Sequence, residues 1–157
     1  MSNIAYTIRP IEPSEWEMAM QLAWDTFLIY EAPEYSQEGI GNFQNFVRDP
    51  NLKKLFLNGN YPVYGAFYDD IMVGLAGFRN HCHLSLLFVE PQYHHQQIAT
   101  NLLRYAIKDI TSKINVEEMT VNSSPYAVEF YHKFGFKNIK GEQTTDGIRY
   151  TPMRLVL

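Results

Sequence analysis

The spacing of apolar residues in the first sixty positions predicts one strand and two helices. Residues 5–11 alternate between apolar and polar side chains, as a strand does. The next stretch carries apolar residues at intervals of four, three and four, which predicts one helical face made of Trp16, Met20, Ala23 and Phe27. Ser14 and Glu17 have the spacing of a capping box at the start of this helix. A second helix is expected from Ser36, although two glycines weaken it.

The middle of the chain predicts a hairpin, a buried strand, a helix and a further strand. Residues 63–68 and 71–78 are rich in β-formers and flank Asp69-Asp70, which favours a hairpin. Residues 83–90 form the most apolar strand and are expected at the centre of the sheet. A helix with one apolar stripe follows: Ile98, Leu102, Leu103, Ala106, Ile107, Ile110 and Ile114. Because a strand–helix–strand crossover makes its strands parallel, residues 116–122 should lie parallel to residues 83–90.

The last forty residues predict a short helix and a closing hairpin. Gly135 is placed to end the helix, and Asp146-Gly147 has the composition of a hairpin turn. Pro152 is expected at a sheet edge or at a bulge, because proline cannot donate to a strand ladder. The whole pattern predicts a single domain over residues 1–157, of the α/β (α+β) class, with a mixed, mostly antiparallel central sheet of about seven strands and helices on both faces.

Composition narrows the partners that this chain is expected to have. The net charge of -4 and the absence of a run of Lys or Arg argue against nucleic acid. No apolar run approaches the roughly 18 residues of a membrane span, so no membrane partner is expected. The N-terminus lacks the pattern of a signal peptide. The single cysteine, Cys82, excludes an internal disulfide, and a cytoplasmic location is expected.

Two segments resemble the GNAT superfamily of acetyl-CoA-dependent N-acetyltransferases. The sequence LLFVEPQYHHQQIATNLL (86–103) is similar to the strand, loop and helix that grip the coenzyme in that family. The sequence VNSSPYAVEFYHKFGF (121–136) is similar to the following strand, small-residue turn and short helix, with its Tyr-x-x-x-Gly-Phe ending. The resemblance implies direct transfer of an acetyl group from acetyl-CoA to a primary amine of a small molecule or peptide. It also implies a sheet splayed between its fourth and fifth strands.

The resemblance further implies which residues hold the coenzyme. Main-chain groups of the fourth strand would bind the pantetheine arm, the following loop and helix start would bind the pyrophosphate, and residues after the fifth strand would flank the coenzyme. These residues are Leu87, Phe88, Val89, His94, His95, Gln96, Gln97, Ile98, Ala99, Thr100, Asn122, Ala127 and Phe130. Gln97 stands where the family has a glycine, and its N–H can donate provided that its φ is negative. Binding is therefore expected to survive but to be weaker than with glycine.

Several of these residues also have ordinary structural interpretations. His94 and His95 could be solvated loop residues, Asn122 could cap a turn, and Phe130 could belong to the core. A metal site is not expected, because no spacing of Cys, His and carboxylate residues typical of a known site accompanies the histidines.

Tyr131 stands at the family's position for the general acid. A phenol with an unperturbed pKa of about 10 is protonated at neutral pH and can donate to a departing thiolate. The general base stays open among Glu90, His83, Cys82, Glu31 and Glu34, with relay through water as a further alternative.

The amine acceptor is expected near the end of the first helix. Aromatic and acidic residues there could hold a cationic amine, namely Tyr30, Glu31, Glu34 and Tyr35. The alternative function is a non-catalytic acyl-CoA sensor or an interaction module that keeps the fold. Exposed strand edges also leave open a homodimer.

Overall fold

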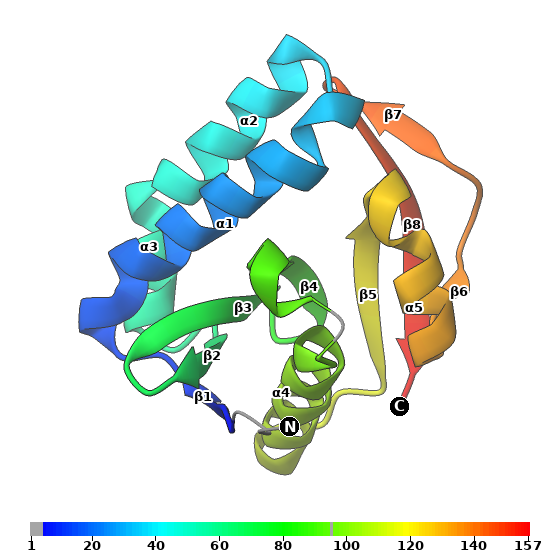
Figure 1. Cartoon of the computed structure of the whole chain (residues 1–157). Coiled ribbons are helices and arrows are strands. Elements are labelled where there is room, and N and C mark those ends of the chain that lie inside the picture. Colours follow the sequence, from blue (N-terminus) through cyan, green and yellow to red (C-terminus); the bar gives the residue numbers. More distant parts are fainter. Residues whose placement is uncertain (1–4, 95) are drawn as a thin grey trace.

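A mixed β-sheet with helices packed on both faces forms the protein, in a computed structural model that describes residues 5–94 and 96–157 (Figure 1). The strands are β1 (Thr7–Pro10), β2 (Val63–Tyr68), β3 (Ile71–Arg79), β4 (His83–Val89), β5 (Glu118–Ser123), β6 (Lys137–Asn138), β7 (Gln143–Thr145) and β8 (Ile148–Val156). Their order is β1-β2-β3-β4-β5-β8-β6, with β7 pairing β8 as well. The described residues therefore give eight strands rather than about seven, because two short strands precede β8 where one was expected.

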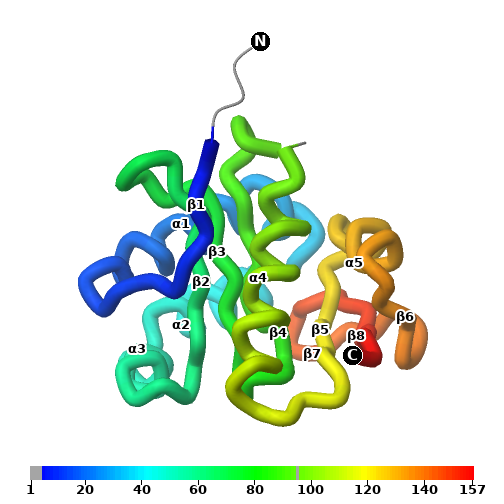
Figure 2. The backbone as a smooth tube through the Cα atoms, turned by 90° about the horizontal axis from the view of Figure 1, so that it is seen from below, coloured from blue at the N-terminus to red at the C-terminus, as the bar shows by residue number. Residues whose placement is uncertain are grey.

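The core consists of two apolar clusters, one on each face of the sheet, and helices cover both. Helices α1 (Trp16–Tyr30), α2 (Gln37–Arg48) and α3 (Pro50–Leu57) contribute to the first cluster, which is centred on Phe27. Helices α4 (Ile98–Lys113) and α5 (Val128–Phe134) contribute to the second. Figure 2 shows α4 lying along β3 and β4, with α5 set apart beside β5. The mixed fold with helices on both faces, predicted from the sequence, is confirmed.

The two halves of the sheet meet only over a short parallel contact. β4 and β5 pair at His83–Thr120 and Leu84–Val121, although β4 continues to Val89. The predicted parallel pair and the splay are both present. Glu90 donates its N–H to the β3 side, at Val73 O, 2.8 Å away. Because main-chain groups alternate in direction along a strand, those of Leu87 and Val89 face the gap between β4 and β5.

The far end of the splayed halves is joined by a second contact, between the start of α2 and the β7–β8 turn. The Ser36 N–H donates to Gly147 O at 3.2 Å, and the Asn42 amide donates to Asp146 O at 3.1 Å. Gly39 is required here, because a Cβ at this position would collide with Gly147 O. The halves are thus held together at both ends, by the short β4–β5 pairing and by the contact of α2 with the β7–β8 turn.

Four local predictions are corrected by the structure. Helix α3 was not anticipated, although Asp49 caps it and Pro50 occupies its first turn. The capping interaction before α1 joins the Glu12 N–H to the Glu15 carboxylate at 2.8 Å, so the predicted box at Ser14 and Glu17 is wrong.

The other two corrections concern the ends of elements. Ile114 follows the end of α4 and is 41% exposed, so it is not part of the apolar stripe. Pro152 lies in β8, an interior strand that pairs with β5, and not at a sheet edge. Proline is tolerated there because β7 pairs with residues 148–150 and β6 with residues 153–154, which leaves position 152 between the two short partners.

Candidate active site

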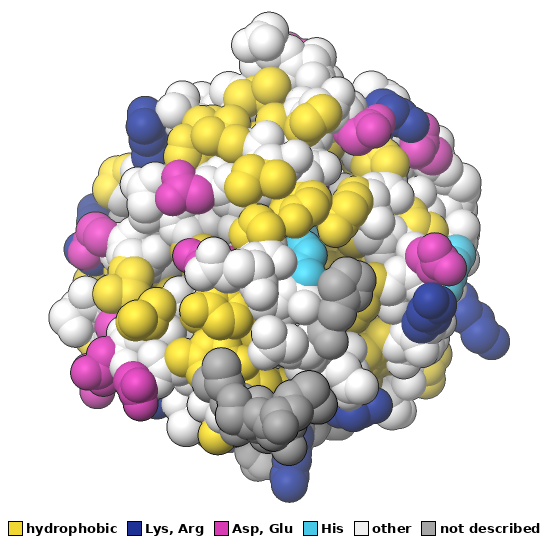
Figure 3. Space-filling view, viewed as in Figure 1, with side chains coloured by type: hydrophobic (Ala, Val, Ile, Leu, Met, Phe, Trp, Pro, Cys, Tyr) yellow, Lys and Arg dark blue, Asp and Glu magenta, His cyan; other side chains and the backbone are white. Residues whose placement is uncertain are grey.

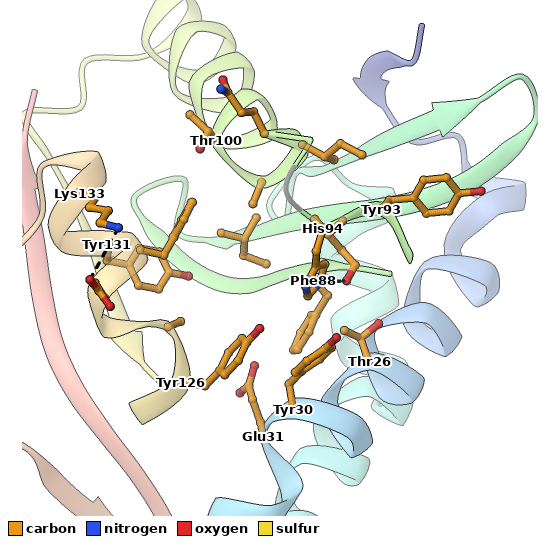
Figure 4. Close-up of a pocket in the computed structure, with 18 residues that line it drawn as sticks. Thr26, Tyr30, Glu31, Phe88, Tyr93, His94, Thr100, Tyr126, Tyr131 and Lys133 are labelled. Atoms are coloured by element: carbon orange, nitrogen blue, oxygen red, sulfur yellow. Dashed lines mark hydrogen bonds and ion pairs between the residues drawn. The ribbon is translucent and has the colours of Figure 1, made fainter. Parts of the chain in front are cut away.

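A cavity of about 650 Å³ opens where β4 and β5 diverge. It runs from the first turn of α4, past the end of β4, to the last turn of α1 and to α5. Figure 4 shows Thr100 at one end and Glu31 at the other, with Tyr131 and Phe88 between them. In the space-filling view, hydrophobic side chains gather across the middle of this face, and most charged side chains lie toward its rim (Figure 3). The residues that line the cavity are Thr26, Tyr30, Glu31, Leu87, Phe88, Val89, Tyr93, His94, Gln97, Ile98, Ala99, Thr100, Tyr126, Ala127, Glu129, Phe130, Tyr131 and Lys133.

Gln97 forms the N-cap of α4 in a left-handed conformation, with φ of 61° and ψ of 21°. The negative φ that was the condition for donation by the Gln97 N–H is therefore not present, and this glutamine adopts the backbone that glycine usually supplies at such a position. Its side chain makes no capping hydrogen bond. The first N–H of the helix to bond within it is that of Asn101, which donates to Gln97 O at 3.0 Å. The preceding N–H groups of the first turn have no intrahelical acceptor by the geometry of a helix, so they can serve an anion.

His94 folds back over the end of β4. Its Nε2 lies 2.8 Å from Val89 O, and because a carbonyl only accepts, the ring nitrogen is the donor. The imidazole also stacks on Tyr30, with 5.0 Å between ring centroids. His94 is thus a lining residue of the cavity with defined contacts.

Tyr131 projects from α5 into the cavity and is only 5% exposed. Burial, followed by the negative charge of Glu31, raises the pKa of its hydroxyl far above the ordinary value for tyrosine. The group is therefore protonated at any physiological pH. It can act as a proton donor, which is the state that the expected general acid requires.

Glu31 faces the cavity from the end of α1. The carboxyl group is half-buried, and the Tyr35 hydroxyl donates to its Oε1 at 3.4 Å. Burial raises the pKa of Glu31 to about 7, against a smaller lowering by the bond from Tyr35. This carboxyl group therefore changes its charge near neutral pH.

A row of three aromatic rings crosses the cavity above Glu31. Tyr30 of α1 stacks on His94 on one side and lies 4.9 Å from Tyr126 on the other, measured between ring centroids. Tyr126 belongs to the short helix η4 (Pro125–Ala127), which links β5 to α5. The row therefore connects three separate segments of the chain and narrows the cavity beside the carboxyl group (Figure 4). The sequence did not single out Tyr126, because nothing in its local pattern shows that it faces Tyr30.

Other residues named from the sequence lie away from the cavity. Gln96 accepts a hydrogen bond from the Tyr68 hydroxyl at 2.5 Å, outside the lining residues. Asn122 is exposed on β5, opposite Pro152. Glu34 forms an ion pair with Arg149 at 2.7 Å, which ties the α1–α2 connection to β8. Tyr35 reaches the cavity only through Glu31, and His95 lies outside the described residues.

The open candidates for a general base are also separated by the structure. His83 sits at the far end of β4, where its Nδ1 lies 2.8 Å from Thr120 Oγ1, and burial lowers its pKa to about 4. Neither His83 nor Cys82 lines the cavity, and Glu90 does not line it either. Among the described residues, no group of three or more His, Cys, Asp or Glu could hold a metal ion. The described helices include none long and apolar enough to cross a membrane.

Comparisons with known proteins match this chain to a family model and to two relatives. Residues 31–157 match the family model of the acetyltransferase (GNAT) domain. The spermidine N(1)-acetyltransferase of Thermoplasma acidophilum is 27% identical over 154 residues, covering 89% of this chain and 91% of the relative. The uncharacterized N-acetyltransferase YafP of Escherichia coli is 24% identical over 143 residues, covering 91% of this chain and 87% of the relative.

Two solved structures share the fold over almost the full length of both chains. A GCN5-related N-acetyltransferase from Rhodopseudomonas palustris superposes with a TM-score of 0.82 at 22% identity, covering 100% of this chain and 99% of that one. The PaiA N-acetyltransferase of Thermoplasma acidophilum, solved with coenzyme A, has a TM-score of 0.78 at 23% identity and covers 98% and 99%. The family model spans most of the chain, so this protein belongs to the GNAT family of acetyltransferases and is an acyltransferase.

Proposed function

We propose that the protein transfers an acetyl group from acetyl-CoA directly to a primary amine of a small molecule or peptide. The observation that carries this proposal is one continuous cavity that joins the first turn of α4, the open edge of β4 and Tyr131. Its volume of about 650 Å³ suits a small ligand or the reactive part of a larger one.

The residues around the cavity fit a coenzyme A arm. The N–H groups of the first turn of α4 would face the pyrophosphate. The main-chain groups of Leu87 and Val89 would pair with the pantetheine amides, because no strand partner occupies that side of β4 beyond Leu84. Val89 O already accepts from His94, but a carbonyl has a second lone pair to offer.

Tyr131 supplies the proton in the proposed reaction. The coenzyme, when bound, provides the activated acetyl group as a thioester. Tyr131 would donate its hydroxyl proton to the sulfur as the carbon–sulfur bond breaks, which avoids the release of a free thiolate. Because the pKa of Tyr131 is raised, its hydroxyl stays protonated until negative charge develops on the sulfur.

The acceptor amine is proposed to enter beside Tyr30 and Tyr126. Aromatic faces and a nearby carboxyl group attract a cationic amine, and Glu31 is the half-buried carboxyl at this end of the cavity. Glu34 and Tyr35 would support the site indirectly, through Arg149 and Glu31. Because one relative is named a spermidine N(1)-acetyltransferase, a polyamine is the first acceptor to test.

Calorimetric titration with acetyl-CoA, followed by an amine panel, tests the proposal. The panel holds spermidine, an aminoglycoside and a short peptide with a free N-terminus, and release of the coenzyme thiol is followed. We expect micromolar binding and turnover of at least one amine. Tyr131→Phe should lower kcat by about 10²–10⁴-fold with little change in coenzyme affinity. The control is Tyr105→Phe, which changes a tyrosine of α4 that does not line the cavity.

Two outcomes would refute the proposal in different ways. No binding at millimolar acetyl-CoA would mean that the cavity does not accept the coenzyme. Binding without turnover of any amine would favour the acyl-CoA sensor instead. Full turnover by Tyr131→Phe would remove Tyr131 as the proton donor while leaving the reaction in place.

A further inference from the structure

We propose that Glu31 is the general base of the reaction and takes the proton of the acceptor ammonium across the cavity from Tyr131. The inference rests on the proposed function and assigns the half of the proton chemistry that the sequence leaves open. It is carried by the position of the carboxyl group in the cavity and by the groups that surround it.

The cavity offers Glu31 few competitors for this role. The cavity lining contains two carboxyl groups, those of Glu31 and Glu129. Glu129 stands on the outer rim, where it is 83% exposed and forms an ion pair with Lys133 at 3.6 Å. Glu31 is half-buried and lies beside Tyr30 and Tyr126, at the end of α1 (Figure 4). A base for the acceptor must lie within reach of the amine, and Glu31 is the lining carboxyl group beside Tyr30 and Tyr126, where the amine is proposed to enter.

Among the described residues, the hydrogen bond recorded for the Glu31 carboxylate is made by Oε1. Tyr35 donates to Oε1, which orients the group and stabilises its charged form. The rings of Tyr30 and Tyr126 lie beside the Glu31 carboxyl group, with 4.9 Å between their centroids. His94 stacks on Tyr30. The charge of Glu31 contributes to the raised pKa of both Tyr126 and Tyr131, so the carboxyl lies within electrostatic reach of both hydroxyls.

Two cationic side chains from β8 and α5 form ion pairs with carboxylates other than Glu31. Arg149 of β8 binds Glu34 at 2.7 Å and Glu142 at 3.2 Å. Lys133 of α5 binds Glu129 at the outer rim. The incoming ammonium would therefore be the cation that meets Glu31. Its desolvation among the aromatic rings would lower the pKa of the amine and so favour transfer of the proton to the carboxylate.

The proposed proton movements balance as follows. The carboxylate of Glu31 accepts a proton from the ammonium, and the freed lone pair of the nitrogen forms the new bond to the acetyl carbonyl carbon. The carbon–sulfur bond breaks, its electron pair stays on sulfur, and Tyr131 gives its proton to that sulfur. The nitrogen loses a second proton, which returns to Tyr131, and Glu31 releases its own proton to solvent. One acetyl group moves from sulfur to nitrogen, and one proton is released overall.

The pH dependence of kcat/KM, taken together with kcat at saturating amine, distinguishes this role from simple binding of a cation, because loss of cation binding alone would raise KM and leave kcat unchanged. With the best amine of the panel, the native protein should show an acid limb with an apparent pKa near that of Glu31, which lies at about 7. Glu31→Gln should lose this limb and fall by about 10²–10⁴-fold in kcat at pH 8. Tyr35→Phe should move the limb to higher pH, because it removes a bond that favours the carboxylate. Glu38→Gln, which alters an exposed carboxyl in the first turn of α2, is the matched control.

An acceptor that needs no base gives a second and independent measurement. Trifluoroethylamine is largely neutral at pH 7, so its acetylation should fall less than tenfold in Glu31→Gln. An unchanged acid limb in Glu31→Gln, or equal losses for the neutral and the cationic amine, would overturn the inference while the proposed acetylation stands. If the native protein turns over no amine, the proposed function itself fails, and the inference falls with it.

Discussion

Replacement of Gln97 by glycine tests the central feature of the α4 loop, its left-handed backbone. A residue with a Cβ costs about 1–2 kcal/mol in this conformation, and Gln97 has a φ of 61°. Glycine avoids that cost, but it also increases the conformational entropy of the unfolded chain, which lowers the free energy of unfolding by about 0.4–1 kcal/mol. We therefore expect Gln97→Gly to raise the free energy of unfolding by up to about 1.5 kcal/mol.

Urea unfolding of a short series isolates the backbone from the side chain. Gln97→Ala keeps the Cβ and so keeps the strain, whereas Gln97→Asn introduces a residue that tolerates the left-handed region. The expected order of stability is glycine first, asparagine next, and alanine close to the native glutamine. If the glycine variant unfolds at a lower urea concentration than the alanine variant, the left-handed conformation of this residue is refuted.

The same series separates the two ways in which Gln97 could affect coenzyme binding. Glutamine and glycine share one backbone shape here, so the N–H groups of α4 keep their positions in both. Any difference in affinity must then come from the glutamine side chain, which lies at the cavity wall. We expect Gln97→Ala and Gln97→Gly to tighten acetyl-CoA binding by similar factors in calorimetry. Tightening in the glycine variant alone would show that the backbone, and not the side chain, limits binding.

Three further substitutions test the electrostatics of the cavity and the contact between α2 and the β7–β8 turn. Folding raises the pKa of Glu31 from 4.5 to about 7, so the folded chain holds more protons than the unfolded chain between these values, and stability is lost as the pH rises through them. Relative to the native protein, Glu31→Gln should therefore gain up to about 3 kcal/mol between pH 4.5 and pH 8 in urea unfolding. Gly39→Ala should cost about 1–3 kcal/mol, because the new methyl group meets the Gly147 carbonyl. Gly41→Ala, with nothing within 4 Å of its Cβ, should instead gain about 0.5–1 kcal/mol.

Each of these expectations has an outcome that contradicts it. A stability difference between Glu31→Gln and the native protein that stays constant with pH would place the carboxyl in contact with water. Equal effects of alanine at positions 39 and 41 would mean that α2 does not touch the β7–β8 turn.

Much of the fold follows from short-range patterns that the sequence displays. The strands β2, β3, β4 and β5, the helix α4 and the end of α5 at Gly135 were predicted because apolar spacing and turn residues act over a few neighbouring positions. Helix α3 was missed, although Asp49 and Pro50 are a visible start signal and Leu52 and Phe56 have helical spacing. Pro152 was misplaced because its tolerance depends on where β6 and β7 end, which no local pattern records.

Residues of the cavity divide in the same way. The resemblance pointed to Tyr131 and to the α4 loop, since both lie in continuous motifs. A cytoplasmic location and a homodimer remain predictions from the sequence. The partners of Glu34 and the contact of Tyr30 with Tyr126 were outside its reach, because they join residues about a hundred positions apart.

The sequence by itself determined the order of the elements other than α3 and the short strands before β8, and it determined the parallel crossover between β4 and β5. It also showed Tyr131 at the start of the Tyr-x-x-x-Gly-Phe motif. Hydrophobic periodicity and turn chemistry are local, so they can be read without knowledge of the fold. Only the tertiary structure decided that Gln97 takes up a left-handed backbone and that Glu31, among several acidic candidates, faces the cavity. Both depend on which distant segments pack together, and burial, which sets the charge state of a carboxyl group, exists only once they have done so.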